Sequence, residues 1–422
     1  MKISIIFSSL VFALRVSSQL GQGNQMQGNQ MQGNQMQGNQ MQGNQMQGNL
    51  PRCGNIITRR DIKSYSDSEL AGLRNTVNYM RENGWFTWFA RVHTENFDTI
   101  HGGPMFLPWH RYFIYDFERL ARNYNSNFAI PYYNSPEDFA DPASSIIFTD
   151  RYLGGNGVGP GNCVTSGMQA GWNLNYPSSK CLNRVYNGGN RIQSWYNPAY
   201  VESLIQRNNN LDSFRSELEY SQHGSVHIGL GGTMSSQESP SDVMFYLHHA
   251  YIDRVWWRWQ TMNPDNMFSY NGRSPSGQSV SLRDNIISYN TDVASVMQLG
   301  YGEMCYQYDG MTFNKNLKSE PGHLVDNKVE AGLRNLTPTV LKKYFPLFSE
   351  KNQSSNSTLS KNMLSSNSSG SNSTVIKMPY PNEPDAMWFK MHGYDLDTAI
   401  KVRNIAVNMI DDLYNAGFSN PY

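Results

Sequence analysis

Two stretches, HTENFDTIHGGPMFLPWH at residues 93–110 and HGSVHIGLGGTMSSQESPSDVMFYLHH at 223–249, hold seven of the nine histidines of the chain. Histidine is the commonest side-chain metal ligand in proteins. Three imidazoles from each stretch would hold two metal ions, and this explains the clustering better than coincidence does. The seven residues are His93, His101, His110, His223, His227, His248 and His249.

The positions of these histidines decide how much the sequence can say about a metal site. His223 and His227, four residues apart on an expected helix, would share one helical face. The first three, from a helix end, a loop and a helix, can converge only through the fold. His248 and His249 are neighbours, so one can bind metal while the other needs a separate hydrogen-bond partner.

Six neutral imidazoles without a thiolate or carboxylate suit copper, zinc, nickel or iron. Two copper ions can each pass one electron to O₂, a redox step that zinc lacks. The two histidines outside the clusters, His323 and His392, are expected to be ordinary surface or core residues.

Apolar periodicity around the two stretches predicts helices. Ser66 and Glu69 fit a capping box, and apolar residues follow them at helical spacing. Residues 131–198 are rich in Gly, Pro, Asn and Tyr and should form long loops. The expected fold is therefore mainly α, a helix bundle with loop decoration. Further helices are expected from Pro108, over 198–206, from Ser213 through His227, over 241–260 and near 400–413.

The ends of the chain have a different character. Residues 1–18 have the Lys2 n-region and short apolar core of a secretory signal peptide, and no later segment is expected to cross a membrane. Residues 19–50 carry five GNQMQ repeats and should be disordered. The repeats could mediate matrix self-association, deliver copper through methionine thioethers, or be a tolerated expansion without a role.

Charge and cysteine content narrow the class of protein. Lys plus Arg and Asp plus Glu both number 34, which gives no basic stripe for nucleic acid. The even cysteine count in an exported chain favours two disulfides. Three pairings are open; Cys163 with Cys181 would close a local loop, and Cys53 with Cys305 would join distant segments. Glycosylation is expected in the Ser/Asn-rich loop 351–374, at Asn352, Asn356, Asn367 and Asn372, and at Asn335.

Two longer segments carry a family resemblance. HGGPMFLPWHRYFIYDFERLAR, residues 101–122, resembles the first copper-binding motif of the tyrosinase and molluscan-haemocyanin (type-3 copper) family, and SPSDVMFYLHHAYIDRVWWRWQ, residues 239–260, resembles the second. The resemblance extends from about Arg59 to Asp309 and includes a Y-x-Y element at 306–308. The ending NAGFSNPY is similar to the ends of mollusc tyrosinase-like proteins.

The resemblance implies a four-helix bundle that holds a dicopper centre within residues 51–312, followed by a C-terminal extension, 313–422. It implies that His93, His101 and His110 bind one copper and His223, His227 and His249 the other, while His248 binds none. It also implies that Glu219 holds a water that helps to deprotonate a phenol. Glu217 is the second choice for this role, and the alternative is that the glutamate is a solvated surface residue without a role in the reaction. Phe106 and Phe245 would lie near the coppers or simply in the core, and Asp253 would pair with the ligand helix or an Arg.

One departure from the family pattern bears on activity. Many members that hydroxylate monophenols have Asn after the first histidine of the second motif, where this chain has Gly224. The sequence therefore predicts a secreted dicopper phenol oxidase that acts on o-diphenols, and more weakly on monophenols, in matrix cross-linking or pigmentation. A haemocyanin-like O₂ carrier and a structural matrix protein with a vestigial copper site are the alternatives, and the segment after Asp309 could cover the site.

Overall fold

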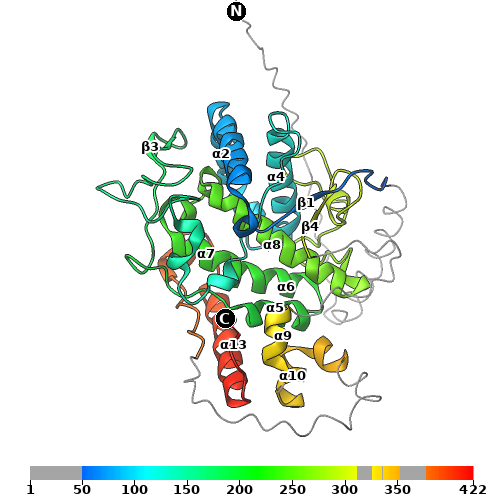
Figure 1. The fold of residues 1–422 in the computed structure, drawn as a ribbon. Coiled ribbons are helices and arrows are strands. Elements are labelled where there is room, and N and C mark those ends of the chain that lie inside the picture. Colours follow the sequence, from blue (N-terminus) through cyan, green and yellow to red (C-terminus); the bar gives the residue numbers. More distant parts are fainter. Residues whose placement is uncertain (1–49, 311–325, 335, 352–376, 422) are drawn as a thin grey trace, which may run out of the picture.

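The computed structural model describes residues 50–310, 326–334, 336–351 and 377–421. Figure 1 shows helix α8 (Val243–Met262) crossing the middle of the molecule, with α2 (Asp67–Glu82) and α4 (Phe106–Ala121) above it. Helix α13 (Leu396–Asn415) lies on the opposite side. The predicted fold class, a mainly α bundle with long loops and a C-terminal extension, is confirmed.

The capping box predicted at Ser66 is present at the start of α2. The Ser66 side chain accepts the backbone N–H of Glu69, whose carboxylate accepts the backbone N–H of Ser66. The apolar residues that follow, among them Val77 and Met80, are buried as the spacing predicts. Gly84, with φ of +78°, then turns the chain directly into α3 (Trp85–Ile100).

The prediction that His93 lies at a helix end is wrong, because α3 runs unbroken from Trp85 to Ile100 and His93 is in its middle. The aromatic run that begins at Trp85 hides the helical period in the sequence. In the structure Phe86, Phe89 and Phe97 face the core, whereas Trp88 remains 38% exposed.

The single helix expected from Ser213 through His227 is also corrected. Helix α6 (Leu211–Leu218) passes into one π turn, η5 (Glu219–His223), before α7 (Gly224–Leu230) begins. A π turn adds a residue to the helix and changes the direction of the side chains after it, and such turns are frequent at functional sites. Here the turn begins at Glu219 and ends at His223.

Two distant segments are joined beside the bundle. Strand β1 (Ile57–Arg59) pairs in parallel with β4 (Tyr306–Tyr308), and a disulfide joins Cys53 to Cys305. The second disulfide, Cys163–Cys181, fastens the loop that contains β2 (Asn173–Leu174) and β3 (Lys180–Cys181). The sequence leaves open three ways to pair the four cysteines, and the structure has the pairing Cys53–Cys305 with Cys163–Cys181.

Loops and short turns fill residues 131–197, as predicted, before α5 (Pro198–Arg207). The 3₁₀ turns of the described residues are η1 (Ile62–Ser64), η2 (Ser135–Asp138), η3 (Pro142–Ser144), η4 (Ile146–Phe148), η6 (Gly232–Ser235), η7 (Ser239–Ser241), η8 (Pro264–Asn266) and η9 (Ala294–Val296).

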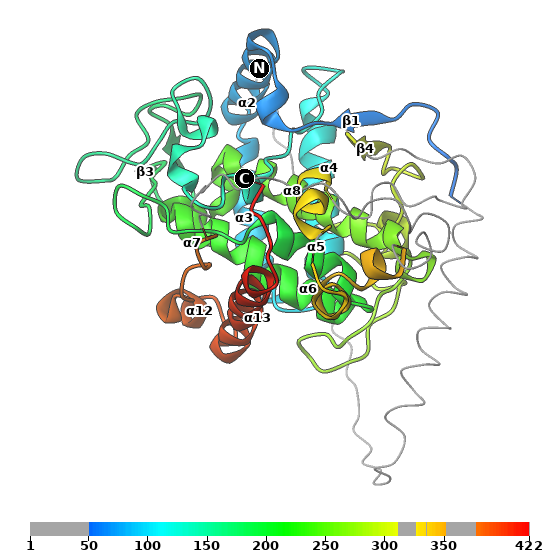
Figure 2. The same ribbon diagram turned by 60° about the horizontal axis from the view of Figure 1, so that its bottom comes forward.

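The C-terminal extension packs in two parts. Helices α9 (Asn327–Leu333) and α10 (Pro338–Tyr344) and the second half of α13 join the main core through residues such as Met409 and Leu413. Helix α12 (Ala386–Met391) and the start of α13 instead form a separate small apolar cluster with Phe97 and Ile228. Figure 2 brings α12 and α13 to the front, beside α6 and α7.

Several predictions lie outside the described residues: the signal peptide 1–18, nearly all of the tail 19–50, the glycosylation sites at Asn335, Asn352, Asn356, Asn367 and Asn372, and His323. Within the described residues, no helix has the length and apolar character needed to span a membrane.

Candidate metal centre

The fold brings the three histidines of the first stretch together. His93 comes from the middle of α3, His101 from the residue that ends it, and His110 from the second turn of α4. One ring nitrogen from each lies within 4.8 Å of the others, and all three residues are buried. The convergence that spacing alone cannot establish is therefore present.

The histidines of the second stretch form a similar group, which the π turn, α7 and α8 contribute. His223 closes the π turn, and His227 lies four residues later in α7. Their ring centroids are 4.6 Å apart. A nitrogen of His248, from α8, lies within 4.8 Å of a nitrogen of each of them. The ring of His249 is also close, with centroids 5.1 Å from His223 and 5.6 Å from His227.

Neighbouring backbone carbonyls orient five of these rings. In each of the five, Nδ1 faces a carbonyl oxygen at hydrogen-bond distance, which makes Nδ1 the donor and leaves Nε2 with a lone pair. Nε2 of His93, His110, His223 and His227 has no hydrogen-bond partner among the described residues. The distances are 2.6 Å for His93 to Gln237, 3.1 Å for His101 to Phe97, 2.8 Å for His110 to Phe106, 3.3 Å for His223 to Glu219 and 2.6 Å for His227 to Met234.

Burial keeps these imidazoles neutral. It lowers the pKa of His93 to about 3 and that of His227 to about 4. Burial also lowers the pKa values of His101, His110 and His223 well below the usual range. A buried nitrogen lone pair destabilises the fold unless a hydrogen-bond donor or a metal ion binds to it. Neutral imidazoles with aligned Nε2 atoms are what a late divalent or monovalent transition metal requires, so the residues fit a pair of metal ions.

The two adjacent histidines of α8 have different surroundings. Nε2 of His248 lies 3.1 Å from the carbonyl oxygen of His223, and the two rings are stacked. Both nitrogens of His249 are buried without a partner among the described residues. The His249 ring is stacked against His110 with centroids 4.4 Å apart. The distances between nitrogens therefore group His248 with His223 and His227. His248 has one buried nitrogen, Nδ1, without a partner among the described residues, whereas His249 has two.

Aromatic side chains enclose the histidines on the bundle side. The Phe106 ring lies 4.8 Å from that of His223, and the Phe245 ring lies 4.1 Å from that of His249, measured between centroids. Both phenylalanines are fully buried. Each of the two rings contacts histidines of both groups, so it presents an apolar surface to the space between them.

Glu219 lies beside the centre, fully buried, and its carboxylate has three donors. They are the backbone N–H of Gly102 at 2.7 Å, Nη1 of Arg215 at 2.9 Å and the hydroxyl of Tyr394 at 2.9 Å. Burial raises the pKa of Glu219, and the Arg215 guanidinium opposes that rise. The carbonyl of the same residue faces Nδ1 of His223.

The second choice from the sequence, Glu217, belongs to a different network. Its carboxylate accepts from Tyr200, Arg207 and Asn208, which connect α5 to α6. Glu217 is therefore a buried residue that holds two helices together, and it is not a solvated surface residue. Gly224 follows His223, and a Cβ at this position would lie 3.3 Å from the carbonyl oxygen of Glu219.

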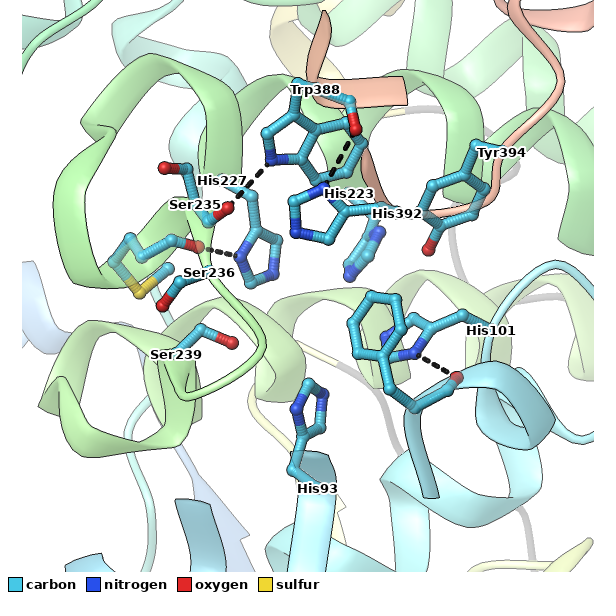
Figure 3. Close-up of a pocket in the computed structure, with 12 residues that line it drawn as sticks. His93, His101, His223, His227, Ser235, Ser236, Ser239, Trp388, His392 and Tyr394 are labelled. Carbon is cyan, nitrogen blue, oxygen red and sulfur yellow. Dashed lines mark hydrogen bonds between the residues drawn. The ribbon is translucent and has the colours of Figure 1, made fainter. Parts of the chain in front are cut away.

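A small pocket opens beside the histidines, and the C-terminal extension forms one of its walls. Figure 3 shows Trp388, His392 and Tyr394 facing His93, His101, His223 and His227 across it. The indole N–H of Trp388 donates to the carbonyl of Ser235 at 3.0 Å. His392, expected from the sequence to be an ordinary surface or core residue, thus lines the same pocket as four of the candidate metal ligands. Its only sequence signal is the four-residue spacing from Trp388, which places both on one helical face.

Behind the centre, Asp253 holds α8 in place, as the sequence suggests. It accepts from Nε of Arg111 at 2.5 Å and from the hydroxyls of Tyr306 and Tyr308 at 2.7 and 2.5 Å. Nη1 of Arg59, at the end of β1, lies 3.5 Å from the same carboxylate. This buried network links the Y-x-Y strand to the helix that carries His249.

Comparison with known proteins gives a consistent picture. The family model of the common central domain of tyrosinase matches residues 83–262. Tyrosinase ustQ of Aspergillus flavus is 30% identical over 291 residues, which are 61% of this chain and 81% of that protein. A tyrosinase of Streptomyces antibioticus is 30% identical over 223 residues, 47% of this chain and 80% of that protein.

A solved structure of a variant of the polyphenol oxidase from Thermothelomyces thermophila matches this chain with a TM-score of 0.52 and 23% identity. The match covers 65% of this chain and 94% of that one, and it supports the fold. The relatives described here come from fungi and a bacterium, so the narrower resemblance to mollusc proteins receives no support from them.

Proposed function

The chain belongs to the tyrosinase family, a family of type-3 copper oxidoreductases, and we propose that it oxidises o-diphenols to o-quinones with O₂. The observation that carries the proposal is the pair of buried histidine groups. Among the described residues, buried Nε2 atoms without a partner belong to His93, His110, His223, His227 and His249. The first copper is assigned to His93, His101 and His110. The second copper is assigned to His223, His227 and His249.

We choose His249 over His248 for the sixth ligand on physical grounds. His248 already has a use for one nitrogen, the hydrogen bond to the His223 carbonyl, which ties α8 to the π turn. His249 has no such use, and two buried nitrogens without partners are costly unless one of them binds metal. Its ring also touches histidines of both groups, as expected of a residue between two ions.

Two copper ions bound there would supply the electrons that reduce O₂ and accept the electrons that leave the catechol. The protein contributes geometry and proton handling. The carbonyls opposite Nδ1 fix the tautomer and direction of five ligands before metal binds, so little reorganisation is needed. Phe106 and Phe245 keep the space between the ligands dry, which strengthens the electrostatic interactions inside it.

Glu219 is the proposed acceptor for the proton of the incoming phenol, directly or through a water that it holds. Its Oε1 takes a hydrogen bond from the hydroxyl of Tyr394, which is itself a phenol. Moving Tyr394 away would free that oxygen for a substrate hydroxyl or a water. Arg215 and the Gly102 N–H would continue to hold the carboxylate in place during the exchange.

Catechol oxidation is proposed as the main activity because of Gly224. This residue has no amide group to orient a water beside Glu219. A catechol loses two electrons and two protons to become the quinone, whereas a monophenol must in addition be deprotonated and gain an oxygen atom before it reaches that stage. Monophenols should therefore depend more strongly on that water.

The C-terminal extension is proposed to keep the enzyme latent. Trp388, His392 and Tyr394 occupy the side of the pocket from which a phenol would approach. Removal or displacement of α12 would then be needed for full activity. Limited proteolysis tests this idea: cleavage after residue 376 that leaves catechol turnover unchanged would count against it.

The same cover favours a second candidate function, reversible O₂ binding of the haemocyanin kind, because a covered site admits O₂ more easily than a phenol. Access decides between the two functions. A structural matrix protein with a vestigial site is less compatible with an intact set of histidines.

Export, glycosylation and a role in extracellular matrix or pigmentation are also proposals. They rest on the leader-like residues 1–18, the N-glycosylation motifs, the repeats in 19–50 and the two disulfides, which persist in oxidising compartments. Detection of the protein in culture medium, with glycan removed by an endoglycosidase, would test the first two.

The deciding experiment is to load the purified protein with copper, count the coppers per chain, and follow O₂ uptake with a catechol and with the matching monophenol. Two coppers and rapid catechol turnover support the proposal. Two coppers with reversible O₂ binding and no turnover, even after removal of α12, would favour the carrier. His110→Ala and His227→Ala should each lose copper and activity; retention of both would refute the ligand assignment.

A further inference from the structure

One loop provides a carbonyl that orients a ligand in each histidine group. Residues 231–242, here called the orienting loop, join α7 to α8 and are built on the 3₁₀ turns η6 and η7. The carbonyl oxygen of Met234 lies 2.6 Å from Nδ1 of His227, and that of Gln237 lies 2.6 Å from Nδ1 of His93. The other three oriented rings face carbonyls four residues earlier in the chain. Of the five rings, these two therefore depend on the loop for their direction.

The orienting loop lies directly against residues 180–185, a segment that includes a disulfide cysteine. Gly231 and Gly232 begin the loop with φ of +59° and +54°. A Cβ at Gly231 would lie 1.9 Å from the carbonyl oxygen of Val185, and a Cβ at Gly232 would lie 2.6 Å from that of Asn183. The approach of the two backbones leaves room for glycine alone. The position of the loop is therefore set by this neighbouring segment.

A first polar contact joins the two segments next to Met234. The backbone N–H of Thr233 donates to the carbonyl of Asn183 at 3.0 Å. The hydroxyl of Thr233 donates to Oδ1 of Asn183 at 2.8 Å, and it lies 3.3 Å from the backbone N–H of the same residue. Thr233 is only 1% exposed, so water cannot replace these partners. The Asn183–Thr233 contact thus holds the residue that precedes the carbonyl facing His227.

A second contact joins the segments next to Gln237. Nζ of Lys180 forms an ion pair with the carboxylate of Glu238, the residue that follows Gln237. Arg184 then fixes the end of the loop through two hydrogen bonds of 3.0 Å to Asp242, the residue that caps α8. The Lys180–Glu238 contact thus holds the residue after the carbonyl that faces His93.

We propose that Asn183 and Lys180 are positioning residues for the metal centre. Asn183 acts on His227, a ligand of the second group. Lys180 acts on His93, a ligand of the first group. Each holds a residue adjacent to the carbonyl that faces the ring, and a ring whose direction is fixed in advance binds metal more tightly. The inference rests on the proposed function, because it takes the two groups to be the copper centre.

The two contacts should differ from general stabilising contacts in one respect. Lys180 is 37% exposed in its side chain, and an ion pair of this kind adds little to the free energy of unfolding. Its loss should therefore be seen in the affinity for one copper rather than in the stability of the fold. Because the two contacts act on different rings, each should affect a different copper.

The test measures copper affinity in variants that each lose one contact. Thr233→Val removes the hydroxyl and keeps the branched shape, whereas Lys180→Met removes the ammonium and keeps most of the stem. Each protein is stripped of copper and titrated with Cu(I) in competition with a chromophoric chelator, without oxygen. We expect one of the two coppers to bind about ten-fold more weakly in each variant, and both coppers to bind more weakly in the double variant.

Two kinds of control separate positioning from loss of structure. Thr233→Ser and Lys180→Arg keep the donor groups and should bind copper as the wild type does. Thr76→Val removes another buried threonine hydroxyl, in α2, and Lys63→Met removes another partly exposed ion pair. These two should leave both affinities unchanged. Equal weakening in the controls, or wild-type affinities in Thr233→Val and Lys180→Met, would overturn the proposal.

A second measurement reads the two rings directly in the copper-free protein. Isotope-labelled histidine gives an NMR signal for each Nδ1–H, and a buried N–H held by a carbonyl exchanges slowly with water. Thr233→Val should speed the exchange of the His227 signal, and Lys180→Met that of the His93 signal. Loss of the His93 or His227 signal in His93→Gln and His227→Gln provides the assignment.

The two rings should respond separately in this measurement. The same change in both signals, or in neither, would refute the positioning roles. Failure of the wild type to bind two coppers would instead refute the proposed function while leaving the exchange pattern intact, so the two failures can be told apart.

Discussion

The ring of His110 on α4 lies face to face with the ring of His249 on α8, with centroids 4.4 Å apart and planes inclined by 12°. The next residue, Arg111, reaches across the same helix pair to Asp253, one turn after His249, at 2.5 Å. The two histidine stretches are thus joined at one level of the bundle. A buried ion pair lies directly behind the stacked rings.

This contact leads to a prediction about the sixth ligand. His249→Gln should remove one copper per chain, because His249 contacts histidines of both groups and both of its nitrogens are buried without a partner among the described residues. His248→Gln should retain two coppers, since the glutamine amide can still donate toward the His223 carbonyl. Copper counting by atomic absorption on both variants is the measurement; one copper in His248→Gln and two in His249→Gln would reverse the assignment.

The residue after His223 should control the ratio of the two phenol activities. Gly224→Asn introduces an amide beside Glu219, and we expect monophenol turnover to rise relative to catechol turnover. The new Cβ meets the Glu219 carbonyl at 3.3 Å, so a shift of a few tenths of an ångström is required. Gly224→Ala adds the same Cβ without the amide and is the control. A similar rise in both variants would mean that the amide is not responsible.

Removal of the indole from the pocket wall should uncover the site. Trp388→Ala loses the hydrogen bond to Ser235 and the stacking on His392. In copper-loaded protein we expect kcat/KM for catechol to rise by about five-fold or more, as the open fraction increases. Lys390→Ala, on the exposed side of α12, should leave it unchanged. A fall in kcat/KM at equal copper content would show instead that Trp388 helps to bind substrate.

Asp253 should be essential for stability. Asp253→Asn leaves the buried guanidinium groups of Arg59 and Arg111 without their shared charge, at a cost of about 3–5 kcal/mol. Tyr308→Phe removes one hydrogen bond to the same carboxylate and should cost only about 1 kcal/mol. Urea unfolding of the copper-free proteins measures both. Equal losses would mean that the charge is not the important feature.

Asp61 should make stability depend on pH. Burial raises its pKa from 3.8 to about 6, so the folded protein binds this proton more tightly than the unfolded chain. The contribution of this proton to the free energy of unfolding is fully present below pH 3.8 and is lost as the pH rises through about 6. Asp61→Asn keeps an acceptor for the Lys63 N–H and should gain up to about 3 kcal/mol at pH 7. Urea unfolding between pH 4 and 7 checks this; parallel curves for both proteins would contradict it.

Much of the local structure follows from the sequence because its causes are local. The capping box at Ser66 and the apolar faces of α2 and α8 depend on residues three or four apart, and such spacing is visible in the chain itself. The two histidine stretches are local too. Their composition suffices to predict a metal centre in a helix bundle.

Errors appear where local signals are hidden or absent. A run of aromatic residues obscures the period of α3, so the sequence wrongly predicts a helix end at His93. No pattern in residues 213–227 predicts the π turn, which changes the position of His223 relative to α6. His392 carries no motif, and its place beside the centre depends on a helix that packs from 165 residues beyond His227.

The sequence by itself determined the helical class and which histidines cluster, and it predicts the metal ligands and a low activity on monophenols. Only the tertiary structure decided that His93, His101 and His110 meet, which cysteines pair, and that α12 walls the pocket. The physical reason is range. Helix spacing acts over a single turn, whereas these contacts join residues separated by whole helices and loops, and they form only when the complete core packs.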